Sequence, residues 1–339
     1  MTAVDPDPFS GPTREVYRQT LLDIARSDPR IFCVDSDVGG LEDGFGREFP
    51  NRYVNVGIAE ANMIGISAGL AAAGLIPYAN TMSAFATLRA CEQLKIDVAV
   101  NRLPVRIVGT HGGLSAGHYG HTHHAVEDLA ILRTLPNLTV IVPADGRETA
   151  NAVRASVDLP GPVFIRLGRA ATPPVYAGPY DFVVGRAVEL RPGRDVTIIA
   201  TSALPVSMAL GVAETLAGDG ISARVVNAHT VRPLDEAAIL RAARETAGIV
   251  TVEDHVLAGG LGGAVCEVVC GAHPCPVRRV AVRAEQAEIV GDERSLLEYS
   301  GVTAERIAAE ARQLLDGVRF PREGEGTDGG GRNFDGALS

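Results

Sequence analysis

Short apolar segments alternate along most of the chain with longer segments of helical periodicity. Strand-like runs, such as residues 31–34 and 105–108, are bounded by turn residues, and amphipathic stretches such as residues 14–25 separate them. Parallel strands need a crossover that is usually helical, so this alternation predicts mostly parallel sheets covered by helices on both faces. The predicted fold class is α/β, with three layers in each unit.

The pattern predicts the same kinds of element in both halves of the chain. The predicted strands are residues 31–34, 54–56, 75–79, 105–108, 138–142, 163–167, 196–200, 223–226, 249–252 and 277–282. The predicted helices are residues 14–25, 59–73, 84–100, 125–134, 147–157, 203–217, 261–270 and 303–315.

The alternation divides the chain into two units. Residues 12–168 form the first predicted domain and residues 186–317 the second. Residues 169–185 between them are rich in proline and predict a linker. Residues 318–339 are rich in glycine and charge and poor in apolar residues, so they predict a disordered tail.

Composition narrows the class of function. The 339 residues are 46% hydrophobic and carry a formal net charge of −10, which disfavours binding to nucleic acid or to an anionic membrane surface. No apolar run approaches the roughly 20 residues of a membrane span, and residues 1–12 lack the apolar core of a signal peptide.

The five cysteines form no C-x-x-C pair, which predicts reduced thiols in a cytoplasmic protein. The alternative is a zinc site built from the last three cysteines and a nearby histidine, although their spacing fits structural zinc sites poorly. Its ligands would be Cys266, Cys270, Cys275 and His273.

Glu60 stands where a predicted strand ends and an Ala- and Gly-rich predicted helix begins. Ligands of open α/β sheets usually bind at such junctions. An acid in a first helical turn is also favoured by the helix dipole alone, so position by itself leaves a structural role open.

The motifs around and after Glu60 resemble the transketolase family of thiamine-diphosphate enzymes. The similar region runs from about residue 14 to residue 315, and its motifs follow one another in the family's order. A full-length transketolase has three domains, and this chain resembles only the last two, the pyrimidine-binding domain and the C-terminal domain. The matching segments are residues 55–73, 110–117, 122–123, 127–130, 135–137, 142–145 and 161–166.

The resemblance implies thiamine diphosphate as the cofactor, with Glu60 hydrogen-bonded to a ring nitrogen of its aminopyrimidine. Such an acid must be partly desolvated to share a proton near neutral pH. Phe85 falls on a family aromatic that packs on this ring, and Met82 falls where another Phe is usual. Leu88, one turn after Phe85, and Asp37 complete the expected cofactor contacts. Ordinary helix core is the alternative for Met82, Phe85 and Leu88, and an ordinary loop carboxylate is the alternative for Asp37.

Five of the eight histidines lie between residues 111 and 124. A metal cluster is one interpretation, and a donor array for a hydroxylated substrate is the other. His111 and His123 match the family's substrate-contacting histidines, which favours the second. Between them, His118 and Tyr119 stand where the family has Glu and Asp, so the specificity for ordinary ketoses is in question. We expect all four side chains at the substrate.

Two arginines match the family's anion-binding positions. Arg166 is expected at a substrate phosphate and Arg14 beside it, because guanidinium groups suit phosphate oxygens. Leu41 occupies the position of the family's phosphate-binding serine, which weakens the case for a phosphorylated substrate.

A metal-diphosphate site is not evident in the sequence. Residues 218–220 read Gly-Asp-Gly, but no Asn occurs from 228 to 332 to complete the family's site, so we interpret them as a turn. The resemblance therefore implies that Mg²⁺ (or Ca²⁺) and the diphosphate are bound by a separate N-terminal-half transketolase subunit, with the two subunits in a heterotetramer.

The predicted function is the C-terminal subunit of a split transketolase, which transfers a two-carbon ketol unit from a sugar or sugar phosphate to an aldehyde. Glu60, His111 and His123 are the predicted catalytic residues. The altered substrate loop suggests an unusual ketose. The alternatives are the beta subunit of a 2-oxoacid dehydrogenase, or a non-catalytic regulatory subunit.

Overall fold

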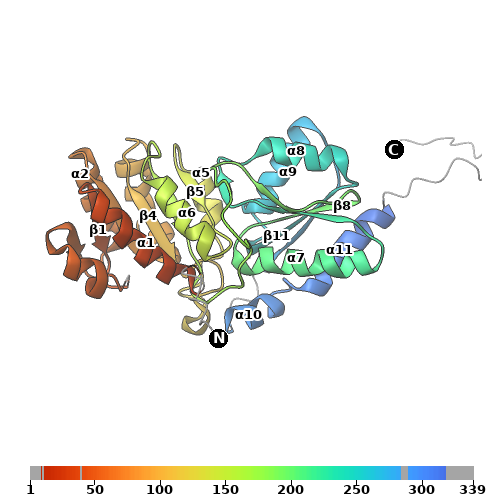
Figure 1. Ribbon diagram of the computed structural model, residues 1–339, viewed down its shortest axis with the longest axis horizontal. Helices are drawn as coiled ribbons and strands as arrows, with labels where there is room; N and C mark the ends of the chain where they lie inside the picture. Colours follow the sequence, from red (N-terminus) through yellow and green to blue (C-terminus); the bar gives the residue numbers. More distant parts are fainter. Residues whose placement is uncertain (1–8, 10, 39, 284–288, 318–339) are drawn as a thin grey trace, which may run out of the picture.

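The computed structural model describes residue 9 and residues 11–38, 40–283 and 289–317. Two sheets with flanking helices lie side by side, one formed mainly by the first half of the chain and one by the second half (Figure 1). This arrangement confirms the α/β fold class. The predicted tail falls outside the described residues.

The first sheet has seven strands in the order β10-β5-β6-β4-β3-β1-β2. All neighbours pair parallel except β10, which pairs antiparallel with β5 at the edge. The strands are β1 Ile31–Asp35, β2 Tyr53–Asn55, β3 Ile76–Met82, β4 Arg106–Thr110, β5 Thr139–Ile141, β6 Val163–Arg166 and β10 Thr230–Arg232.

Neighbouring residues of each strand pack on opposite faces of this sheet. Val34 and Ile107 belong to the core beneath α2, α5 and the helical turns after β3, whereas Cys33 and Val108 belong to the core beneath α1 and α6. Burial on both faces is typical of parallel sheets. The helices are α1 Thr13–Ser27, α2 Glu60–Ala72, α3 Ser83–Leu88, α4 Cys91–Gln93, α5 Asp128–Thr134 and α6 Gly146–Ser156; the shorter helical turns are η1 Glu42–Gly46, η2 Pro50–Arg52, η3 Leu94–Ala99 and η4 Gly117–Tyr119.

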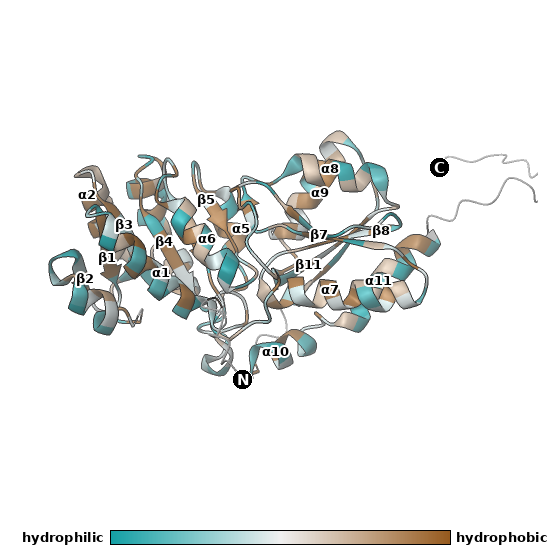
Figure 2. Ribbon diagram, viewed as in Figure 1, coloured by the Kyte–Doolittle hydropathy of each residue, from teal (hydrophilic) through white to brown (hydrophobic). Residues whose placement is uncertain are grey.

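The second sheet has five strands in the order β12-β11-β8-β9-β7, with only β7 antiparallel. Helices α7 and α11 cover one face and α8 and α9 the other (Figure 1). Apolar colour concentrates on central strands such as β4, and polar colour on helix faces turned outward (Figure 2). The elements are β7 Val188–Arg191, β8 Val196–Ala200, α7 Ala203–Gly218, β9 Ala223–Asn227, α8 Glu236–Glu245, β11 Ile249–Val256, α9 Leu261–Ala272, β12 Val277–Val282, α10 Glu293–Tyr299 and α11 Ala304–Gly317.

The structure adds two strands, β7 and β10, and two α-helices, α8 and α10, to the predicted set, together with the short helical turns η1, η2 and η4. The single helix predicted over 84–100 is divided into α3, α4 and the π-type turn η3. The Gly-Asp-Gly segment at 218–220 is a turn after α7, as interpreted from the sequence, and Asp219 there pairs with Arg312 of α11 at 2.6 Å. The domain boundaries at 168 and 186 stay a prediction.

The predicted linker is held by one buried carboxylate. Glu148 of α6, which is inaccessible to solvent, accepts hydrogen bonds from the hydroxyls of Tyr176 and Tyr180 at 2.8 and 2.7 Å. It also accepts from the side-chain amide of Asn227 in β9 at 2.9 Å. This one carboxylate thus fixes the linker against α6 of the first unit and β9 of the second, and it connects the two units.

Candidate active site

The predicted site residues gather at the carboxyl ends of the strands in the first sheet. Met82 ends β3, His111 follows β4, and Glu60 begins α2 after β2. Ligands of parallel sheets bind at this edge because the loops that leave it converge there. The histidine-rich loop of residues 111–124 crosses the same edge.

Glu60 lies in the first turn of α2 and is only 3% exposed. The preceding turn is shaped by Gly57, which has a φ of 69° and donates its N–H to the side-chain oxygen of Asn55 at 2.9 Å. The two Glu60 carboxylate oxygens accept from Arg89 Nη1 at 3.2 and 3.3 Å. A buried carboxylate with a single, half-exposed cationic partner is available to a ligand that can offer it a proton.

Aromatic rings continue from Glu60 toward the histidine loop. The Arg89 guanidinium lies 3.9 Å from the Phe85 ring centroid. The Phe85 ring meets His123 edge-on at 5.2 Å, and His123 stacks with Tyr119 at 5.1 Å. His111 approaches the other side of Tyr119 at 6.2 Å. The structure therefore brings Glu60, Phe85 and the two matched histidines into one continuous surface.

A cavity of ≈ 280 Å³ lies beyond this surface, between the histidine loop and the start of α10. Arg14, His118 and Arg169 line it together with Glu293. Arg169 lies over the Tyr119 ring at 5.6 Å and is hydrogen-bonded to His118. Asp292 lines it as well, so two guanidinium and two carboxyl groups face this cavity, and the guanidinium groups are the ones that can bind an anionic group.

Arg166 lies elsewhere, and the structure corrects its predicted role as a phosphate ligand. It is 2% exposed, and all of its N–H groups are used inside the protein. Nε donates to Asp128 at 2.7 Å and Nη1 to Asp254 at 2.6 Å and to Ser202 at 2.8 Å. Nη2 donates to the backbone oxygens of Ala125 and Asp254. No N–H group remains for a substrate phosphate.

Arg169 reaches the cavity together with Arg14, and sequence analysis missed Arg169. It follows Arg166 by three residues, just beyond the end of β6. The position of Arg169 relative to β6 could have indicated this. A residue just outside a strand can turn its side chain toward the loops, whereas the pleat of β6 fixes the direction of the Arg166 side chain.

Three other predicted residues differ in their exposure. Met82 is 8% exposed at the end of β3, next to the helix that carries Phe85. Leu88 is 59% exposed, one turn beyond Phe85. Asp37 is exposed with a φ of 68°, and its carboxylate lies 3.5 Å from the Asn55 amide at the turn before Glu60. Their cofactor contacts stay predictions.

His111 is neutral at physiological pH. Burial, together with the nearby charges of Arg14 and Arg169, lowers its pKa to about 4. The Thr110 hydroxyl lies 2.9 Å from Nδ1, so Nε2 is the ring nitrogen available to a substrate. A neutral imidazole can donate or accept a hydrogen bond without adding charge to the site.

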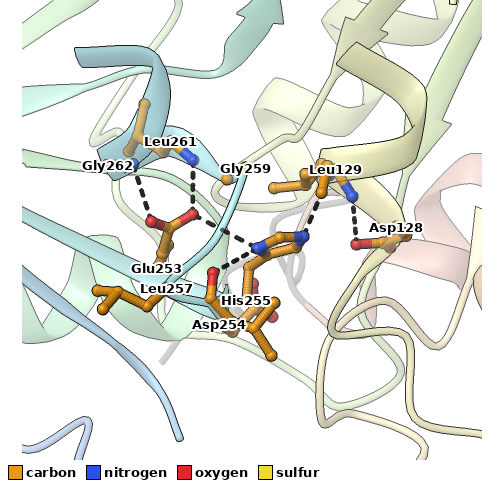
Figure 3. Close-up of polar contacts among 12 residues, drawn as sticks. Asp128, Leu129, Glu253, Asp254, His255, Leu257, Gly259, Leu261 and Gly262 are labelled. Carbon is orange, nitrogen blue, oxygen red and sulfur yellow. Dashed lines mark hydrogen bonds and ion pairs between the residues drawn. The ribbon is translucent and has the colours of Figure 1, made fainter. Parts of the chain in front are cut away.

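A buried polar network beside the site joins the two sheets (Figure 3). His255 at the end of β11 accepts the N–H of Ala130 in α5 at 3.1 Å and donates to the Val256 oxygen at 2.7 Å. Glu253 accepts two N–H groups from the start of α9, and burial raises its pKa to about 7. With the Arg166 ion pairs, this network fixes α5 and the histidine loop against the second sheet.

The described residues contain no group of three or more His, Cys, Asp or Glu side chains that could bind a metal ion. All five cysteines and the histidines of the loop are among these residues, so the zinc site and the metal-cluster interpretation are not supported. Across the described part of the chain, every helix is too short or too polar to cross a bilayer.

Comparison with known proteins assigns families to both units. Residues 11–174 match the transketolase pyrimidine-binding domain, and residues 185–307 match the transketolase C-terminal domain. The chain is 41% identical to the 6-deoxy-6-sulfo-D-fructose transketolase subunit SqwH of Clostridium sp., over 91% of this chain and 95% of that one. It is 39% identical to an apulose-4-phosphate transketolase subunit of Phocaeicola vulgatus, over 89% and 97% of the two chains.

A solved structure is also similar. It is described as a split gene transketolase in an inactive beta4 tetramer, and it superposes with a TM-score of 0.81. That chain is 38% identical, and the match covers 90% of this chain and 98% of that one.

Replacing Arg166 should destabilise the fold. Arg166→Met leaves Asp128 and Asp254 buried without a cation, and we expect a loss of about 3–5 kcal/mol in the free energy of unfolding. Urea unfolding measures it. Arg169→Met is the matched control and should stay within about 0.5 kcal/mol of the wild type, because Arg169 lies at an open cavity. Equal midpoints for Arg166→Met and the wild type would contradict the assigned role.

The lowered pKa of His111 predicts a specific pH dependence. Between pH 6.5 and about 4 the unfolded state binds a proton that folded His111 does not, so this residue reduces stability as pH falls through that window. We expect the imidazole NMR signals of His111, assigned with His111→Gln, to stay flat from pH 8 to about 5. In urea the same signals should titrate near 6.5. A folded-state midpoint close to 6.5 would refute the interpretation.

Proposed function

This chain belongs to the transketolase family, and we propose that it provides the substrate-facing half of a thiamine-diphosphate site that a separate subunit completes. The reaction is the transfer of a two-carbon ketol unit from a ketose to an aldehyde. The observation that carries the proposal is the continuous surface from the buried Glu60 carboxylate through Phe85 and His123 to Tyr119 and Arg169.

The residues present fit an aminopyrimidine. Glu60 is a desolvated acid able to share a proton with a ring nitrogen, and the Phe85 ring beside it offers a stacking face. Thiamine diphosphate, when bound, supplies the carbanion that attacks the ketose carbonyl. Glu60 would hold the proton on the ring nitrogen, and Met82 and Leu88 would border the same pocket.

The histidines would orient the ketose. His123 packs edge-on against Phe85, which places its ring between the pyrimidine side and the substrate side of the surface. Neutral His111 can donate to a carbonyl oxygen, or donate to or accept from a hydroxyl group, without adding charge to the site. Tyr119 stacks on His123 and limits the positions that its ring can take.

The far end of the substrate would be anionic. Arg169 and Arg14 line the cavity, and Arg169 lies over the Tyr119 ring, so these two arginines take the role predicted for Arg166. The named relatives act on 6-deoxy-6-sulfo-D-fructose and apulose-4-phosphate, each of which carries an oxyanion group. A sulfonate or phosphate on the sugar would satisfy the same forked donors.

A partner subunit would supply Mg²⁺ and the diphosphate site. The surface beside Glu60 exposes apolar side chains, among them Ile58 at 74% and Leu88 at 59%, which suits burial against another chain. The similar split gene transketolase forms an inactive beta4 tetramer, which supports self-association without activity. We infer an assembly of two copies of each subunit. The five unpaired thiols suit a reducing compartment such as the cytoplasm.

Glu60 tests the proposed function. In the complex with the partner subunit, Glu60→Gln should lower the rate of ketol transfer by about 10²–10⁴-fold, because a proton partner of the cofactor is lost. The measurement is turnover with a ketose donor and an aldehyde acceptor, and the exposed Glu92→Gln is the control. Full activity of Glu60→Gln would indicate a non-catalytic subunit.

Arg169 tests the anion end of the site. Arg169→Met should raise KM for a phosphorylated or sulfonated ketose by about 10–100-fold, since charge-assisted hydrogen bonds contribute about 1.5–3 kcal/mol. With the corresponding uncharged ketose the KM should change little, which serves as the internal control. An equal increase for both sugars would contradict an anion-binding role.

A further inference from the structure

Arg89 occupies the space between Glu60 and Phe85. One guanidinium nitrogen donates to both Glu60 oxygens at 3.2 and 3.3 Å, and the guanidinium carbon lies 3.9 Å from the Phe85 ring centroid. The side chain thereby covers the face of Phe85 that adjoins Glu60. Phe85 also contacts His123 edge-on, and His123 in turn stacks on Tyr119.

A heterocycle that bonds Glu60 and stacks on Phe85 needs this same space. This argument rests on the proposed function, which assigns these two residues to the cofactor's aminopyrimidine. Two planar groups cannot both lie against one face of Phe85 while bonding the same carboxylate. Either Arg89 leaves, or the cofactor does not reach Glu60.

The exposure of the Arg89 side chain allows it to move out of this space. Its side chain is 50% exposed at the end of α3, whereas Glu60 is 3% exposed. A half-exposed ion pair and a cation over an exposed ring are both weak interactions in water, so a ligand can break this contact. While it lasts, it compensates a buried carboxylate that would otherwise lack a cation.

We propose that Arg89 is a latch that fills the pyrimidine site of the empty subunit and is displaced when thiamine diphosphate binds. The latch protects the fold from an unpaired buried acid before assembly, and it makes cofactor binding compete with an internal ion pair. Its removal therefore tightens cofactor binding.

The test is calorimetric titration of thiamine diphosphate, with Mg²⁺ present, into the assembled and cofactor-free complex of the two subunits. Arg89→Ala should bind about tenfold more tightly than the wild type, which corresponds to about 1.4 kcal/mol. Arg89→Lys should fall between the two, because a lysine keeps the charge and loses the planar stack. The control is Arg26→Ala, which should leave the affinity unchanged. It removes an arginine of α1 that has the same exposure of 50% and pairs with Glu48.

A second titration checks that the latch acts through Glu60. In a Glu60→Gln background the ion pair is absent, so Arg89→Ala should tighten binding by less than about threefold. A gain of undiminished size in that background would overturn the ion-pair latch. Wild-type affinity, or weaker binding, in Arg89→Ala alone would overturn the proposal and make Arg89 a cofactor-holding residue. If the wild-type complex bound no thiamine diphosphate, the proposed function itself would fail.

Discussion

A buried carboxylate at the start of a helix is the constraint around which this site is organised. Glu60 is removed from water by the Ala- and Gly-rich turns of α2, so any group that approaches it must supply a proton or a charge. In the structure that group is the half-exposed Arg89. The rest of the surface follows from this position, because Phe85 and the histidine loop converge on the same edge of the sheet.

Three arginines have different roles because their burial differs. Arg166 is enclosed by Asp128 of α5 and Asp254 of β11 and holds the units together. Arg169 lies at an open cavity and keeps its charge available. Arg89 is half exposed and stacks on Phe85, so its contacts can be exchanged for those of a ligand. A guanidinium whose five N–H groups all donate to protein acceptors has a structural role, whereas one with free N–H groups can bind a ligand.

The alternation of strands and helices was readable from the sequence because each buried strand and amphipathic helix carries its own periodicity. Glu60 and His123 lie in contiguous sequence motifs, which is why the sequence predicts them as site residues, and their catalytic roles stay predictions. Arg166 was misassigned because sequence spacing does not show which way a residue at a strand end points. The edge strand β10 was missed because it is three residues long and pairs with a sheet formed about 90 residues earlier, a tertiary contact that no local pattern contains.

The C-terminal unit supports the site through its contacts with the first unit, although it supplies few of the site residues. Glu148 binds both linker tyrosines and Asn227, and Arg166 is paired with Asp254 within β11. These contacts hold α5, which in turn fixes the end of the histidine loop through Ala130 and His255. The loop also has turns of its own and a backbone bridge between Gly113 and Ala125, so the first unit and these contacts with the second sheet position it together. Buried charged groups between the two units thereby contribute to the geometry of a site that lies on the first unit.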